Sequence, residues 1–337
     1  MKAFLHILFI CMLSCLALPC FAEEKEEEAF DVAATIFEHL GDSYEWHIAG
    51  DCVIPLPCIV IEKGGVATFM SDEIEDGKVC KGYHIAEEGE YEGKIVNADG
   101  ERPFDISITK NVLELLIVCT VMCVVILSLA AWYRKHGHKK APGGFVGAME
   151  AVIDFVDKDI VKASIGHGYE KFSYYLLTIF FFILTCNLLG LLPVFPGGAN
   201  LTGNITVTAT LAITSFIAIN FFAPKEYYKS IFWPDVPLFL KAIPLMPVIE
   251  FIGVFTKPFS LTIRLFANIL AGHVVILSLT CLIFITEPMG EMMNGSMTVV
   301  SVLFCLFMNC LELLVAFLQA YVFTMLTATF IGMAHNE

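Results

Sequence analysis

The sequence predicts an all-α polytopic membrane protein with a small exported α+β domain at its amino terminus. The 337 residues are 57% hydrophobic and their mean hydropathy is +0.74, whereas soluble proteins are roughly 45–50% apolar. After residue 110 the apolar residues gather in about five membrane-crossing segments, and the last two segments are unusually long. Before residue 110 the chain is acidic and carries short alternating apolar runs, which are typical of a water-exposed domain.

The net charge of −15 belongs to one part of the chain. Residues 23–110 hold 22 Asp and Glu against seven Lys and Arg, and outside this range the two signs balance. Proteins that bind nucleic acid present a basic surface, so nucleic acid is not an expected partner. The cysteines and histidines lack the paired spacing of metal sites. We therefore expect neither a metal nor another cofactor.

Residues 1–22 have the form of a secretory signal peptide. Lys2 precedes an apolar run, and Ala22 precedes an acidic stretch, which predicts cleavage after Ala22. The alternative is an uncleaved membrane anchor, although the run is shorter than the roughly 20 residues of a membrane span. A lipid anchor at Cys20 is a weaker alternative because Pro19 precedes it.

Residues 23–110 are interpreted as the exported domain. Ala29–Leu40 has a helical pattern, and the apolar runs Pro57–Ile61 and Val66–Met70 flank Lys63-Gly64-Gly65. A Gly-Gly pair between two apolar runs predicts a β-hairpin. No catalytic constellation is evident in this domain.

Three cysteines, Cys52, Cys58 and Cys80, fall in the exported domain. In an oxidising compartment two of them can pair, and Cys52 and Cys58 are nearest in sequence. The sequence leaves this disulfide undecided.

The membrane domain is assigned to residues 111–337. Its first three predicted spans are Val112–Tyr133, Phe172–Leu192 and Ile205–Phe222. Basic residues at 134–140 follow the first span and predict that this end is cytoplasmic. The amphipathic pattern of residues 141–171 is typical of a helix at the cytoplasmic interface, and a soluble linker helix is the alternative.

The last two apolar segments are Leu245–Thr286 and Thr298–Met333, with a turn expected near Glu287–Ser296. As a helix the first would be about 60 Å long, about twice the hydrocarbon thickness. It must be broken, strongly tilted or nearly horizontal. Lys225, Lys229 and Lys241 mark a cytoplasmic loop before it. This pattern puts the carboxyl terminus in the cytoplasm.

Arg264 lies in the middle of a segment that is apolar enough to lie in a membrane. A charge at that depth costs at least about 2.5–3.5 kcal/mol, and no carboxylate stands three or four residues away to pair with it. On a helix Arg264 shares a stripe with Ser260, Asn268 and Ala271, and such small and polar residues let another helix approach closely. We favour an arginine held for a carboxylate of another chain. The alternatives are snorkelling to the surface and pairing within the chain.

Four further polar residues accompany Arg264. Glu250 precedes it by fourteen residues, about 21 Å along a helix, and His273 follows it by nine. Glu312 and Gln319 share a face of the last helix because they are seven residues apart. Antiparallel packing would bring His273 and Glu312 together on the exported side. Intramembrane acids and histidines are typical of proton relays, and a structural hydrogen-bonded pair is the alternative.

Three segments resemble signatures of the a subunit of F-type ATP synthase. They are Arg-Leu-Phe-Ala-Asn at 264–268, the last-helix segment 312–323 that contains Glu312 and Gln319, and Asn-Leu-Leu-Gly-Leu-Leu-Pro at 187–193. The resemblance covers roughly residues 105–335. It implies a non-catalytic proton-channel subunit of a rotary complex in the cell inner membrane.

The resemblance also implies roles and partners. Arg264 would face the rotating c-subunit ring, with Asn268 and Gln319 as its polar neighbours. Glu250 would line the cytoplasmic half-channel, and His273 and Glu312 the exported-side one. Further implied partners are the b-subunit peripheral stalk, the other ATP synthase subunits and membrane lipid.

The sequence departs from the family pattern in places. His273 and Glu312 stand in the order opposite to that of many bacterial relatives, and Gly190 replaces a frequent acid. The exported domain is not usual in the family, and its role stays open.

Two other classes of protein are alternatives. A secondary ion-coupled transporter would carry an internal repeat, yet no second Arg-x-x-x-Asn segment occurs in the other half of the chain. A structural scaffold would leave Arg264 dispensable. The sequence does not decide between H⁺ and Na⁺ as the ion, nor the size of the ring.

Overall fold

The computed structural model describes residues 41–336, except for 50–51, 63–64, 75–77, 87–90, 138–140, 193–196 and 233–244. The predicted signal peptide, the helix expected at Ala29–Leu40 and Lys241 lie outside these residues. The chain divides into two compact units. One comprises residues 119–191 and the chain from 200 onward, and the other comprises the chain up to Val118 together with 192–199.

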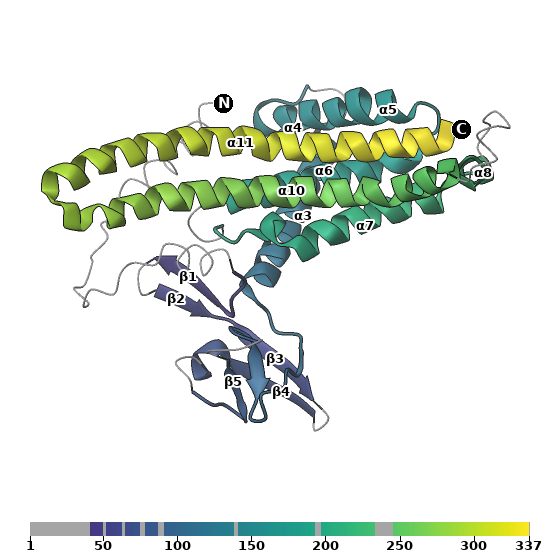
Figure 1. The fold of residues 1–337 in the computed structure, drawn as a ribbon. Helices are drawn as coiled ribbons and strands as arrows, with labels where there is room; N and C mark the ends of the chain where they lie inside the picture. Colours follow the sequence, from purple (N-terminus) through teal and green to yellow (C-terminus); the bar gives the residue numbers. More distant parts are fainter. Residues whose placement is uncertain are drawn as a thin grey trace. The chain divides into compact units, whose positions relative to one another are not determined.

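The amino-terminal unit is built from short antiparallel strands (Figure 1). β1 (Glu45–Ala49) pairs with β2 (Cys52–Pro55), and β5 (Tyr83–Ile85) pairs with β6 (Ile95–Asn97). β3 (Pro57–Glu62) lies between β4 (Gly65–Met70) and β7 (Phe104–Asp105), and the short 3₁₀ turn η1 (Ser71–Glu73) follows β4. The β3–β4 pair confirms the predicted hairpin. Gly65 has φ +136°, which a residue with a Cβ rarely adopts.

Alternation along β3 creates the core of this unit. Cys58 and Val60 point inward and are fully buried, and Phe69 of β4 stacks on Tyr83 with ring centroids 5.9 Å apart. Tyr44 is buried beside them, and its hydroxyl donates a hydrogen bond to Asp105 Oδ2 at 2.6 Å. Alternate residues of a strand point to the same face, and the inward-facing residues of these strands therefore meet in one small apolar cluster.

Two cysteines of this unit are free thiols. Cys58 is buried and its Sγ donates to the Leu56 carbonyl at 3.7 Å, and burial raises the pKa of its thiol to about 11. Cys80 Sγ donates to Glu73 Oε2 at 2.9 Å. The suggested Cys52–Cys58 disulfide is thus not formed, and the Cys52 side chain lies outside the described residues.

The rest of the chain is helical. The long helices are α3 (Lys110–His136), α6 (Glu170–Gly190), α10 (Leu245–Ile285) and α11 (Glu291–Asn336). By length and composition all four can cross a membrane, whereas the apolar helix α7 (Ile205–Phe221) is shorter. The chain is a multi-pass membrane protein, with helices in the five predicted places and four of them of spanning length.

The amphipathic stretch between α3 and α6 is helical, as predicted. It consists of α4 (Gly144–Asp154), the π-helical segment η3 (Phe155–Lys162) and α5 (Ala163–Ile165). Val156, Ile160 and Val161 of η3 are buried in the helical core. A shorter helix, α8 (Lys225–Phe232), follows α7.

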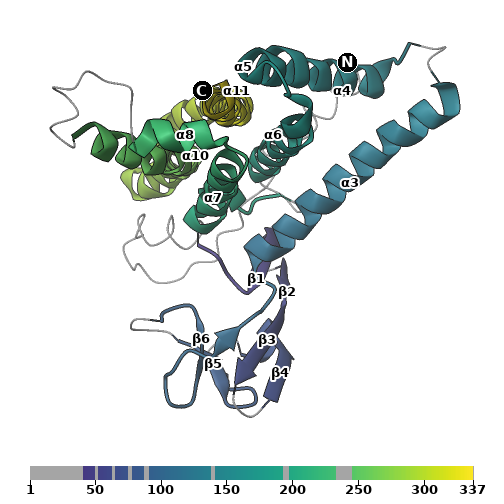
Figure 2. The same cartoon turned by 90° about the vertical axis from the view of Figure 1, so that its right-hand side faces the viewer.

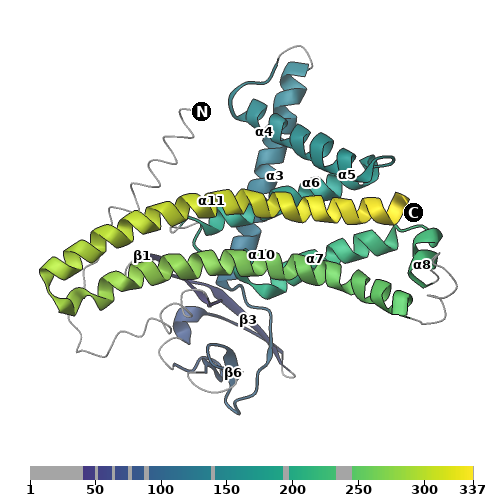
Figure 3. The ribbon, with the colours of Figure 1, turned by 45° about the horizontal axis from the view of Figure 1, so that its top comes forward.

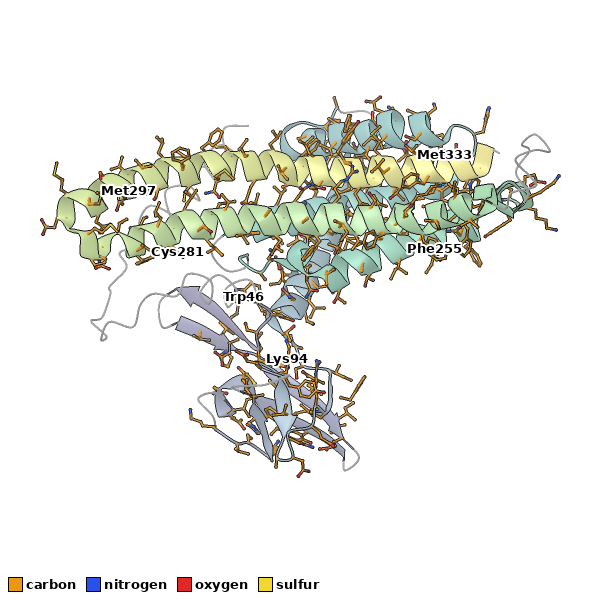
Figure 4. All side chains as sticks on the ribbon, in the orientation of Figure 1. Trp46, Lys94, Phe255, Cys281, Met297 and Met333 are labelled. Atoms are coloured by element: carbon orange, nitrogen blue, oxygen red, sulfur yellow. The ribbon has the colours of Figure 1, made fainter. Side chains whose placement is uncertain are left out.

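α10 and α11 form a long antiparallel hairpin (Figures 1 and 3). Cys281 and Met297 lie toward its turn, and Phe255 and Met333 lie toward the opposite end (Figure 4). Pro258 stands inside α10, and the helix continues through it. The Thr262 hydroxyl donates to the Pro258 carbonyl at 3.0 Å.

The turn of this hairpin is shorter than the sequence predicted. It contains the 3₁₀ segment η5 (Glu287–Met289), and α11 begins at Glu291, not at Thr298. Asn294 explains the difference, because its backbone N–H donates to the Gly290 carbonyl and its side chain accepts from the Thr286 hydroxyl at 3.2 Å. Residues with the composition of a loop thus form the first turn of the helix.

α6 packs on α11 and α7 packs on α10, as the view along the hairpin shows (Figure 2). Near its end α11 also lies against α5. A Cβ added at Gly332 would overlap the Ser164 carbonyl oxygen, so this close approach requires glycine.

We predict that Gly332→Val separates α11 from α5 and destabilises the helical unit. Overpacking at a close backbone contact costs about 1–3 kcal/mol. Gly253→Val is the matched control, because a Cβ at this α10 glycine would meet open space. Thermal unfolding of the detergent-solubilised variants checks this, and equal stability of the two variants would contradict the tight contact.

We also predict different reactivities for the two free thiols. In single-cysteine variants a membrane-impermeant maleimide should modify Cys80 readily and leave Cys58 intact until the protein is unfolded. The reason is that Cys58 is fully buried and its thiol pKa is raised to about 11, whereas Cys80 is partly exposed. Mass spectrometry of the labelled protein provides the measurement, and rapid labelling of Cys58 in the folded protein would contradict the buried position.

Candidate functional site

A small polar pocket lies among α6, α10, α11 and the 3₁₀ turn η4 (Leu201–Gly203). The cavity volume is about 10 Å³, which is roughly enough for one water molecule. Its lining residues come from these four elements and from the loops beside them: Asn187, Gly190, Leu191, Asn200, Thr202, Asn268, Ile269, His273, Glu312, Val315 and Ala316. Polar side chains thus converge inside an apolar bundle.

At this pocket a glycine of α10 leaves room for a carboxyl group of α11. A Cβ added at Gly272 would overlap Glu312 Oε1. Small residues allow membrane helices to approach in this way. His273 follows Gly272 directly, and both His273 and Glu312 line the pocket. The structure therefore brings together an acid and an imidazole that lie 39 residues apart in sequence.

Asn268 also lines the pocket from α10, whereas Gln319 does not. Gln319 is buried on α11, with 7% of its surface exposed. The backbone of Glu250 lies in the first turns of α10, and its side chain is outside the described residues. Of the six predicted site residues, three share the pocket.

Arg264 does not line the pocket and lies on an exposed stripe of α10 beside the buried core. Leu261 and Leu265 are almost fully buried, whereas Ser260, Arg264, Asn268 and Ala271 are exposed. We call these four residues the arginine stripe. Within the described part of the chain Arg264 forms no salt bridge. This finding excludes pairing with a described carboxylate of its own chain.

Three polar residues of the pocket, Asn187, Asn200 and Thr202, were not among the predicted site residues. Asn187 appeared in the sequence analysis only as part of a motif, and Asn200 and Thr202 were not named. The Thr202 hydroxyl donates to Asn187 Oδ1 at 2.9 Å, and Asn187 Nδ2 donates to the Ala316 carbonyl at 3.2 Å. The polar residues near the end of α6 and before α7 were the available signal.

The pocket has the groups for proton transfer. A carboxyl group and an imidazole can each take up and release a proton near neutrality when their surroundings are suitable. The pocket has room for about one water molecule, which could form a bridge between the carboxyl group and the imidazole. Among the residues described, no three His, Cys, Asp or Glu side chains gather as a metal site.

Comparison with known families covers nearly the whole described chain. The family described as ATP synthase A chain matches residues 115–332. A separate family, described as Domain of unknown function (DUF8433), matches residues 35–114.

Relatives named ATP synthase subunit a support the first match. The protein from Chloroherpeton thalassium is 47% identical over 236 residues, which cover 68% of this chain and 67% of the relative. The protein from Chlorobium phaeobacteroides is 48% identical over 242 residues, with 69% and 67% covered. That from an Anaeromyxobacter species is 32% identical over 331 residues, with 94% and 73% covered. The chain belongs to the ATP synthase A chain family.

Proposed function

We propose that the arginine stripe on α10 faces a ring of c subunits and that Arg264 attracts the ionised carboxylate of each passing c subunit. Family membership makes the chain a non-catalytic, proton-translocating subunit of F-type ATP synthase. This sets aside the transporter and scaffold alternatives. The observation that carries the proposal is that a cation and its polar neighbours are exposed on a membrane-grade helix.

The energetics of the bilayer explain why a partner is needed. An exposed arginine in hydrocarbon costs at least about 2.5–3.5 kcal/mol, and the described residues provide no carboxylate for it. A carboxylate on a neighbouring chain would offset this cost. The small side chains of Ser260 and Ala271 would let that chain approach closely.

We propose that the pocket with His273 and Glu312 is the exported-side half-channel. A proton would pass through it to a c-subunit carboxylate, and the neutralised carboxylate could then rotate into lipid. Glu250, about 21 Å before Arg264 along α10, would line the cytoplasmic half-channel in which the proton leaves. Asn268 and Gln319 would be the polar neighbours of Arg264 between the two half-channels.

Arg264 would also prevent protons from leaking directly between the half-channels, because a fixed cation repels them. The proton would then cross the membrane only with rotation of the ring. A membrane potential contributes about 2.3 kcal/mol per charge per 100 mV to this rotation.

We further propose the topology given by the charge pattern. Residues 1–22 would be a signal peptide, 23–110 an exported periplasmic domain and 111–337 the membrane domain in the cell inner membrane. The basic residues at the end of α3 support a cytoplasmic loop there, and the two family matches meet at 114–115. The carboxyl terminus would be cytoplasmic. The b-subunit stalk and other subunits of the complex would contact this chain.

We predict that Arg264→Ala abolishes proton-driven ATP synthesis in membranes that contain the assembled complex, because the c-subunit carboxylates then lose their fixed countercharge. Arg134→Ala is the matched control. Arg134 is also exposed but lies in the last turn of α3, so synthesis should persist. Near-normal synthesis by Arg264→Ala would refute the proposed role.

We predict that a cysteine at Ala271 forms a crosslink with a cysteine on the outer helix of the c subunit near its carboxylate. The accessible native cysteines are first replaced by alanine. Phe259→Cys is the control, because this exposed residue points about 140° away from Arg264 on the same helix. Immunoblots of oxidised membranes provide the measurement. Equal crosslinking at both positions would show that the stripe does not define the interface.

A further inference from the structure

We propose that Thr202 is a positioning residue for Glu312 and acts through Asn187. The turn η4 would then fix the place of the carboxyl group in the exported-side half-channel. This inference rests on the proposed function of the pocket. It assigns a role in proton uptake to a residue of the turn η4 that carries no titratable group.

A chain of two hydrogen bonds connects the loop to α11. The Thr202 hydroxyl donates to Asn187 Oδ1 at 2.9 Å, and Asn187 Nδ2 donates to the Ala316 carbonyl at 3.2 Å. Thr202, Asn187 and Ala316 are 1%, 3% and 0% exposed. These two hydrogen bonds therefore run along the wall of the pocket, where their polar groups are shielded from bulk water.

The turn that presents Thr202 is itself well fixed. Asn200 Oδ1 accepts from the Gly203 N–H at 2.9 Å, and a Cβ at Gly203 would overlap the Asn200 side chain. The Asn204 side chain accepts from the Thr206 N–H at 2.9 Å and caps α7. Leu201 is buried between these two anchors. The hydroxyl of Thr202 thus stands at one defined place.

The anchored carbonyl lies one helical turn after Glu312. Residues four apart on a helix are about 6 Å apart along its axis, so a shift of α11 at Ala316 also moves Glu312. There is little room for such a shift, because the Glu312 carboxyl lies against Gly272 of α10. The link from loop to α11 therefore sets how Glu312 meets His273 across the pocket.

Asn187 depends on Thr202 for this purpose. Without the hydroxyl, Asn187 Oδ1 would be a buried acceptor that has lost its donor. The side-chain amide would then gain from rotating or moving toward water, and the bond to the Ala316 carbonyl would weaken. A buried acceptor that loses its donor shifts the equilibrium between the bonded and the displaced positions of the side chain by about tenfold or more.

The test compares Thr202→Val, which removes the hydroxyl at similar size, with Thr202→Ser, which keeps it. Passive proton conduction is measured across a pH series in membranes that contain the assembled complex with its catalytic sector removed, and is normalised to the amount of this subunit. Thr202→Val should lower conduction about tenfold and move the pH of half-maximal conduction. Thr202→Ser should restore the original profile. An unchanged rate and pH profile in Thr202→Val would overturn the proposal.

Thr206→Val is the matched control because Thr206 is an exposed threonine four residues away, outside the pocket. Its conduction should stay within about twofold of the original, as is usual for surface substitutions. A loss equal to that of Thr202→Val would mean that any threonine change near η4 has this effect. The proposal would then fail.

A second comparison tests whether Thr202 acts through Asn187. Asn187→Ala should lower conduction by itself, and adding Thr202→Val should lower it no further. The reason is that the effects of two substitutions are not additive when both residues belong to the same hydrogen-bond network. Two independent, multiplying losses would overturn the proposed route. If Thr202→Val does not assemble, the pair Thr202→Val with Asn187→Leu should assemble, because both polar partners are gone. That pair should still conduct poorly, and normal conduction would refute the proposal.

Glu312→Gln separates this inference from the proposed function. If Glu312→Gln abolishes conduction and Thr202→Val has no effect, the pocket remains the proton path and only the role of Thr202 is wrong. If Glu312→Gln conducts normally, the proposed half-channel is wrong and the inference fails with it.

Discussion

The cost of an uncompensated charge in hydrocarbon is the constraint on which the functional arrangement depends. Arg264 is exposed on α10 while Leu261 and Leu265 of the same helix are buried. Within the described residues no carboxylate compensates the arginine, and a lone charge at that depth costs at least about 2.5–3.5 kcal/mol. In the proposed arrangement, a carboxylate of a neighbouring chain completes this surface of the α10–α11 hairpin. Membership of a family of ATP synthase subunits agrees with this physical incompleteness.

Much of the architecture could be predicted because it follows local periodicity. The apolar runs Pro57–Ile61 and Val66–Met70 and the glycines between them predicted the β3–β4 hairpin. The long apolar segments predicted α3, α6, α7, α10 and α11. The stripe around Arg264 followed from helical geometry alone, since its members repeat at three and four residues. Such patterns need no knowledge of the partner segments.

Contacts between irregular segments could not be predicted in the same way. The bond from Thr202 to Asn187 joins a loop to a helix end, and no period relates the two residues. The start of α11 was misplaced because Asn294 and Gly295 have loop composition, whereas the Thr286–Asn294 bond stabilises a helical turn there. Burial of Gln319 likewise depends on which neighbours pack around α11. In each case tertiary packing overrides local propensity.

Pro258 has a further consequence for the amino-terminal part of α10. Proline lacks an N–H, so the Val254 carbonyl, four residues earlier, loses the donor that an α-helix would normally supply. In lipid an unsatisfied carbonyl costs several kcal/mol, and such groups are tolerated where other donors or ordered water reach them. Val254 lies between Glu250 and Arg264 in sequence. If Glu250 lines the cytoplasmic half-channel as proposed, the carbonyl that Pro258 leaves without its helical donor lies on the same stretch of α10, where it can accept a hydrogen bond from water.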